Sequence, residues 1–149
     1  MSNWYLCKVK VDRNTEDGSI KKVTEPYLID ALSYTEAEAR ITEHFEDDTP
    51  DFQVTNIAKA NYSDIIPSDL GEVWFKAKVS FISIDEQAGK EKKINQYMLI
   101  QAEDLEGALN NLKEGLKGFT VPYEMHAITE TTIFDVVEYS SSDASDQQS

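Results

Sequence analysis

The sequence predicts an α+β protein made of two β-β-α-β units in tandem, with mainly antiparallel sheet and both helices on one side. The segment "KKVTEPYLIDA" at 21–31 returns 71 positions later as "KKINQYMLIQA" at 92–102. Each copy follows a stretch of strand-like alternation and precedes a helical pattern. One such unit cannot bury its sheet face and helix stripe alone, so we expect the two units to be related by a pseudo-twofold axis. The pattern leaves open whether they form one sheet or two.

The match between the halves continues with almost no gap over roughly sixty residues, which is typical of an internal repeat. Upstream of the quoted segments the offset becomes 70, because one residue enters the loop between the halves. Matched pairs include Leu28 and Leu99, Ala37 and Ala108, Ile41 and Leu112, and, at the shorter offset, Trp4 and Trp74.

The first half starts with a half-buried strand, because apolar and polar residues alternate from Tyr5 to Val11. Asp17-Gly18 predicts a turn that leads into the returning strand. Ser33 and Glu36 form a capping box, and apolar residues then recur at helical spacing. We therefore expect strands over 4–12, 20–31 and 52–66 and a helix over 34–46.

The second half follows the same plan. Ala88-Gly89 predicts the turn between its first two strands. Asp104 is suited to cap a helix, which Gly115 and Gly118 end. We expect strands over 73–83, 91–102 and 123–138 and a helix over 105–115.

These elements predict one domain over residues 1–139, made of repeats at 3–66 and 73–138. The segment "PSDLG" at 67–71 links the two repeats. The last residues, 140–149, are polar and low in complexity, so their composition predicts a disordered tail.

Composition narrows the classes of function. The chain has 28 acidic and 14 basic residues, a net charge of −14, which repels phosphate backbones on average but permits local basic patches. Its single cysteine excludes a disulfide framework or a cysteine zinc site within one chain. Because no signal peptide and no membrane-spanning run is seen, we expect a cytoplasmic protein without a membrane partner.

The segments "WYLCKVKVD", "KKVTEPYLIDALSYTEAEARI" and "YMLIQAEDLEGALNNLKEGLKG" resemble a family of unknown function from gut bacteria and their phages. The likeness covers nearly the whole chain except the Ser-rich tail. This resemblance implies a small stand-alone intracellular domain, often carried on phage or mobile elements. It implies no activity.

No motif predicts catalysis, a metal site or a cofactor. Cys7 lies on the inward face of the first strand, where a packing role is expected rather than a reactive thiolate. His44 suits the C-terminal end of a helix, and His126 fits the surface of a strand. There is no phosphate-binding glycine motif, and an enzyme is the least favoured class.

Charge patterning gives the most specific hypothesis. Ten of the 14 basic residues lie on the two predicted hairpins, whereas acids gather on the helices. Alternation places Trp4 with lysines on one face of the first strand, and Trp74 with lysines on one face of the matching strand in the second half. Proteins bind single-stranded nucleic acid on such surfaces, where bases stack on the aromatic ring and phosphates contact the lysines. The predicted binding residues are Trp4, Lys8, Lys10, Lys21, Lys22, Trp74, Lys76, Lys78, Lys92 and Lys93.

Other interpretations stay open. Lysines on exposed strands also protect sheet edges against aggregation, and a tryptophan at each strand start can serve only the core. A protein-interaction or inhibitor module could instead use the acidic helical side, with Glu36, Glu43 and Asp47, to bind a basic partner or mimic nucleic acid. A structural protein of unknown role is a further alternative, and the oligomeric state is not predicted.

Overall fold

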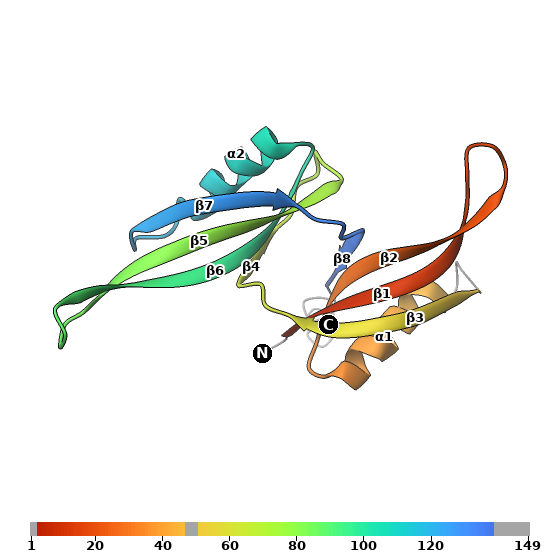
Figure 1. Cartoon of the computed structure of the whole chain (residues 1–149), viewed down its shortest axis with the longest axis horizontal. Coiled ribbons are helices and arrows are strands. Elements are labelled where there is room, and N and C mark those ends of the chain that lie inside the picture. The colour runs from red at the N-terminus through yellow and green to blue at the C-terminus, as the bar shows by residue number, and fades with distance from the viewer. Residues whose placement is uncertain (1–2, 47–50, 139–149) are drawn as a thin grey trace, which may run out of the picture. The chain divides into compact units, whose positions relative to one another are not determined.

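The computed structural model describes residues 3–46 and 51–138. The chain divides into two compact units, the first made of residues 1–61 and 132–149 and the second of residues 62–131. Each unit contains one four-stranded, mostly antiparallel sheet with one helix packed on it (Figure 1). The predicted α+β class with mainly antiparallel sheet is confirmed, and the strands form two sheets.

The first unit has the strand order β3-β1-β2-β8. Strand β1 pairs antiparallel with both β2 and β3, and β8 pairs parallel with β2. Its elements are β1 (Asn3–Asn14), β2 (Ile20–Ala31), α1 (Tyr34–Glu46), β3 (Phe52–Ala60) and β8 (Asp135–Val137).

The second unit has the order β4-β6-β5-β7, with β5 in the place of β1 and β6 in the place of β2. Beyond Phe81, the last residue of β5 that pairs with β7, the β5–β6 hairpin continues as a two-stranded ribbon (Figure 1). Its elements are β4 (Asp64–Ile66), β5 (Val73–Asp85), β6 (Lys90–Ala102), α2 (Leu105–Leu116) and β7 (Tyr123–Glu130).

Alternation along the strands fixes which face of each sheet meets its helix. In the first unit Cys7, Val9 and Ile29 are buried against Ile41 of α1. In the second unit the buried core holds two sets of side chains, one from the strands and one from α2. They are Phe75, Ala77, Val79, Met98 and Ile100 from the strands and Ala108, Leu112 and Leu116 from α2. The opposite sheet face of each unit is called its helix-free face below.

Local signals place the turns and helix starts as predicted. Gly18 and Gly89 adopt positive φ angles of 86° and 66° in the hairpin turns, a conformation that favours glycine. Ser33 Oγ accepts from the Glu36 amide at 3.1 Å, and the Glu36 carboxylate accepts in return from the Leu32 amide at 3.3 Å. Asp104 caps α2 by accepting from the Gly107 amide at 2.8 Å.

The predicted single strands over 52–66 and 123–138 are wrong, because each is two strands in different sheets. After β3 in the first unit, the chain enters β4, which pairs with β6 of the second. After β7 in the second, it returns as β8, which lies beside β2 of the first (Figure 1). Asp64 of β4 pairs with Met98, and Asp135 of β8 pairs with Tyr27. These pairs correspond at the offset of 71, so β4 and β8 have the same register in their sheets.

The first unit is built from two segments, residues 1–61 and 132–149, whereas the second is the continuous segment 62–131. The first sheet needs a strand that follows the second unit in sequence, and the second sheet needs one that follows β3. The predicted pseudo-twofold relation, the common side for both helices and the single-domain organisation stay predictions. The predicted disordered tail at 140–149 lies outside the described residues.

Candidate nucleic-acid interface

The helix-free face of the second unit gathers lysines and aromatic rings. Lys76 lies opposite Leu99 and Thr129 in the sheet, and Lys78 opposite Tyr97 and Ala127. Residues directly opposite on antiparallel strands point to the same face, so Lys76, Lys78 and Tyr97 share it. The side chain of Lys76 is exposed, and Lys78 and Tyr97 are half-buried.

Two tyrosine rings flank Lys76. Its Nζ lies 4.6 Å from the centroid of the Tyr97 ring and 5.9 Å from that of Tyr62, both within the range of cation–π attraction. Tyr62 is held near by Ser63, whose amide donates to the Tyr97 carbonyl at 2.8 Å. Burial raises the pKa of the Tyr62 hydroxyl, so the ring stays neutral at physiological pH.

Beside Tyr97, three polar side chains form a row across the strands: Asn95 from β6, Ser80 from β5 and His126 from β7. Ser80 Oγ donates to Asn95 Oδ1 at 2.6 Å and lies 2.7 Å from His126 Nε2. Ser80 is only 1% exposed, whereas Asn95 and His126 are exposed. His126 reaches this face because β7 has an irregularity opposite Lys78 and Val79, where one extra residue enters the strand.

Beyond this row, Lys93 and Glu124 form an exposed ion pair at 3.3 Å. The Glu124 carboxylate lies 3.8 Å from His126 Nε2, the same nitrogen that faces Ser80. A catalytic triad would need the carboxylate on the other ring nitrogen and an accessible serine. These residues therefore do not form a nucleophilic site.

Trp74 belongs to the helix-free face by register, opposite Gln101, but it is only 4% exposed. Its ring is therefore covered in the structure, and the hypothesis that Trp74 stacks on a base stays a prediction. Lys92 is exposed but lies opposite Ser83, on the other face from Lys76. Of the predicted residues in this unit, the structure brings together Lys76, Lys78 and Lys93.

The first unit presents a similar but less aromatic face. Trp4 is half-buried, and Lys8 and Lys10 are exposed on the same side of β1. Lys22 lies opposite Asp12 on this helix-free face, whereas Lys21 lies opposite Arg13 on the other. No described aromatic ring is recorded over a lysine in this unit.

Instead, the first unit places its distinctive polar group on the helix side. Arg13 donates to both oxygens of Glu25, at 2.8 and 2.7 Å, and the Tyr27 hydroxyl donates to the same carboxylate at 2.8 Å. The hydrogen bond from Arg13 is the main cause that lowers the pKa of Glu25. Burial is the main cause that raises the pKa of Tyr27. Glu25 and Tyr27 are buried and Arg13 is partly exposed, and the hydrogen bonds among them make this a structural cluster.

The other residues considered in the sequence are Cys7, His44 and Asp47. Cys7 is fully buried, and burial raises the pKa of its thiol to about 11, which keeps it protonated and unreactive. His44 lies at the end of α1, where its ring contacts Tyr27 with centroids 5.6 Å apart. Asp47, part of the predicted acidic surface, lies outside the described residues.

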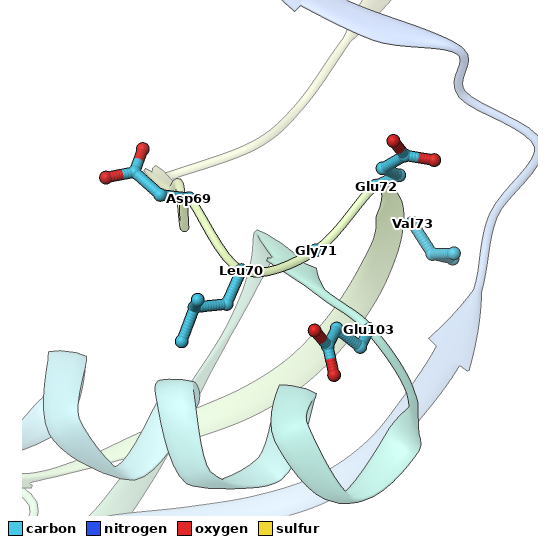
Figure 2. A pocket seen from close by; sticks show the side chains of 6 residues that line it. All are labelled: Asp69, Leu70, Gly71, Glu72, Val73 and Glu103. Carbon is cyan, nitrogen blue, oxygen red and sulfur yellow. The ribbon is translucent and has the colours of Figure 1, made fainter.

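A pocket of about 490 Å³ lies beside the chain that leads into β5 (Figure 2). Asp69, Glu72 and Glu103 line it, but Figure 2 shows their carboxylates pointing in different directions. Gly71 also lines it, and a Cβ added there would lie 2.1 Å from the Ala102 carbonyl carbon. Within the described ranges, no group of three or more His, Cys, Asp or Glu is arranged to hold a metal ion.

Sequence reasoning missed Tyr62, Tyr97, Ser80 and Asn95. Alternation from the buried Met98 would have assigned Tyr97 to the lysine face. Ser80 is a polar residue within the apolar stretch "KVSFI", a signal that such a residue has a buried partner. The contact of Tyr62 with Lys76 depends on the path of the chain into β4, which no local pattern predicts.

Comparisons with known proteins identify the family and nothing further. A family model described as "Domain of unknown function (DUF4494)" matches residues 3–139, and the chain belongs to this family. No curated protein and no solved structure matches the chain. In the described part of the chain, no helix is long and apolar enough to span a membrane.

Proposed function

We propose that the protein is a non-enzymatic binding module that holds single-stranded nucleic acid on the helix-free face of its second unit. The observation that carries this proposal is Lys76 beside the rings of Tyr97 and Tyr62, with Lys78 next to it on the same strand. This is narrower than a surface made of both hairpins, because, among the described residues, the contacts between lysines and partly accessible rings lie in this unit.

The physical basis is the combination of stacking and charge. A base that stacks on an aromatic ring gains about 1–3 kcal/mol, and lysines along the same strand can contact successive phosphates. The ammonium of Lys76 now over Tyr97 would move to a phosphate when a base takes its place. The lost cation–π contact is thereby replaced by a stacked base on the ring and an ion pair at the ammonium.

The distribution of charge favours this face over others. The two hairpins, residues 3–31 and 73–102, hold ten basic and eight acidic residues, a net charge of +2. The other residues hold four basic and twenty acidic ones, a net charge of −16. A polyanion is therefore directed to the hairpins and repelled elsewhere, which gives weak binding with a strong dependence on salt.

Fluorescence anisotropy with a labelled 15-mer of deoxythymidine tests the proposal, at about 50 mM salt and protein up to about 50 µM. We expect saturable binding that weakens as salt rises. The variant Lys76→Gln/Lys78→Gln should reduce affinity at least about tenfold. Lys113→Gln/Lys117→Gln, with the same charge change on α2 and just after it, is the matched control and should change affinity much less. Absence of binding by the unmodified protein rejects the proposal.

The acidic helices favour one alternative, a protein-interaction or inhibitor module that binds a basic partner. Glu38 and Glu43 are exposed on α1, whereas Glu36 is paired with Arg40 at 2.9 Å. In this alternative, Glu38→Lys/Glu43→Lys abolishes capture of a basic protein, whereas neutralising Lys76 and Lys78 has no effect. Either function fits the phage or mobile-element context that the family resemblance implies.

A further inference from the structure

Ser80 holds two exposed side chains in place on the proposed binding face. The residue is 1% exposed, and its hydroxyl contacts Asn95 from β6 and His126 from β7, at 2.6 and 2.7 Å. Exposed side chains normally keep their rotamer freedom, and fixing them costs entropy. Here, a buried hydroxyl fixes two of them across three strands, next to the row that holds Lys78 and Tyr97.

The single proton of the Ser80 hydroxyl determines what its neighbours present to solvent. Ser80 donates it to Asn95 Oδ1, so His126 Nε2 must be the donor in its contact with Ser80. The Asn95 amide nitrogen then keeps both N–H donors for other partners. In the neutral imidazole, the other ring nitrogen of His126 is left as an acceptor. The row therefore offers donors and an acceptor at fixed positions.

This polar row is adjacent to the ring on which a base would stack. Asn95 is two residues before Tyr97 on β6, so the two side chains share the helix-free face about 7 Å apart along the strand. Glu124 is the one acid of this row, and its charge is balanced by Lys93 at 3.3 Å. Glu124 therefore opposes the approach of a phosphate to this row less than an unpaired carboxylate would.

We propose that Asn95 and His126, oriented by Ser80, recognise the hydrogen-bonding edge of a base in the bound strand. This inference rests on the proposed function and adds selectivity to it. Asn95 and His126 are binding residues, and Ser80 is a positioning residue that acts through them. The ligand is a single-stranded oligonucleotide in which at least one base lies with its edge across β5.

The first unit supplies a comparison within the same chain. At the offsets that align the halves, Lys10, Thr24 and Thr55 stand where the second unit has Ser80, Asn95 and His126. Thr55 occupies the matching irregularity of β3, and its hydroxyl donates to the Lys8 carbonyl at 3.2 Å. The first unit therefore lacks the fixed donor and acceptor pair, and base selectivity is assigned to the second unit alone.

The test is anisotropy with labelled 15-mers of dT, dA and dC, measured for the unmodified protein and for Ser80→Ala. We expect the tightest and weakest oligonucleotides to differ at least about fivefold for the unmodified protein, since a well-placed base contact discriminates by at least this factor. Ser80→Ala keeps the lysines and Tyr97, so its affinity averaged over the three oligonucleotides should change less than about threefold. In Ser80→Ala, the ratio of affinities between the tightest and weakest oligonucleotides reports stacking alone and should fall below about twofold.

A second variant, His126→Ala, changes an exposed side chain and leaves the fold intact, so it should show the same loss of selectivity. If the unmodified protein binds all three oligonucleotides and Ser80→Ala and His126→Ala keep the same ratios, the inference is wrong while the proposed function stands. If the unmodified protein binds all three oligonucleotides with equal affinity, the inference is also wrong and the proposed function also stands. If nothing binds, the proposed function is wrong and this inference with it.

Discussion

The two units share one strand order, but the hydrogen-bonded polar cluster lies on the helix side in the first unit and on the helix-free face in the second. In the first unit, the polar cluster of Arg13, Glu25 and Tyr27 lies on the helix side, where Glu25 and Tyr27 are buried. In the second unit, Met98 occupies the position of Tyr27, and the polar residues lie on the helix-free face around Ser80. The shared apolar pattern determines the topology, and the residues that differ determine what each face can bind.

The largest expected effect tests whether the two cores are equivalent. Ile41 and Leu112 occupy matching helix positions and are both fully buried. Ile41→Ala and Leu112→Ala should each lower the free energy of unfolding by about 2–5 kcal/mol. Urea denaturation followed by circular dichroism measures this. A loss below about 1 kcal/mol for only one of them would show that the two cores contribute unequally.

The position of β8 predicts that Leu112→Ala unfolds in one transition. The first sheet receives β8 only after the chain has passed through the second unit, residues 62–131, so unfolding of the second unit leaves this edge strand attached through a long unfolded connection. Tryptophan fluorescence and circular dichroism should therefore give coincident curves. Two separated transitions would contradict this coupling.

The next largest loss of stability is expected at Gly71, which has no matching glycine in the first unit. Gly71 lies so close to the Ala102 backbone that an added Cβ would meet its carbonyl carbon at 2.1 Å. Gly71→Ala should cost at least about 1–3 kcal/mol, because backbone overlap cannot be relieved by a rotamer change. Gly118→Ala is the control, since nothing lies within 4 Å of its added Cβ. Equal thermal midpoints for both variants would contradict the close approach.

Substituting each of two matched residues, Glu25 and Gln96, by the residue of the other unit compares the polar contacts of the two units. Gln96 stands in the second unit where the first has Glu25. Glu25→Gln weakens the contacts with Arg13 and Tyr27 and should cost about 1–3 kcal/mol at pH 7. Gln96→Glu, at a half-buried position, should cost less. Urea denaturation of both variants measures the difference.

The Glu25 contacts also predict a dependence on pH. Since folding lowers the pKa of Glu25 from 4.5, its stabilisation is fully present above that value and is lost as pH falls through the folded pKa. The unmodified protein should therefore lose stability more steeply below about pH 4.5 than Glu25→Gln does. Parallel slopes for the two proteins between pH 3 and 6 would argue against the shifted carboxylate.

A smaller effect concerns the ring under Lys76. Tyr97→Leu should weaken oligonucleotide binding about fivefold or more, because the stacking surface is lost. Tyr97→Phe keeps the ring and should bind within about twofold of the unmodified protein. If the two variants weaken binding equally, the hydroxyl matters rather than the ring, and the stacking account fails.

Much of this fold follows from local signals, and the rest depends on tertiary contacts. Ser33 and Asp104 mark the helix starts, and Gly18 and Gly89 mark the hairpins, because each acts within a few residues. The breaks at 61–63 and 131–134 were missed, since apolar residues such as Ile65 and Val136 continue the pattern of the preceding strand into a different sheet. The face of Trp74 could be read from alternation, but its burial depends on packing that alternation does not describe.

The central claim is that the helix-free face of the second unit, rather than that of the first, binds single-stranded nucleic acid. The salt dependence of oligonucleotide affinity tests it most directly, in Lys76→Gln/Lys78→Gln and in the matched first-unit variant Lys8→Gln/Lys10→Gln. If both second-unit lysines contact phosphates, their loss should reduce the log–log slope by about 1.4, at about 0.7 per contact. The first-unit variant should leave the slope nearly unchanged. Equal reductions, or a larger one in the first-unit variant, would contradict the claim.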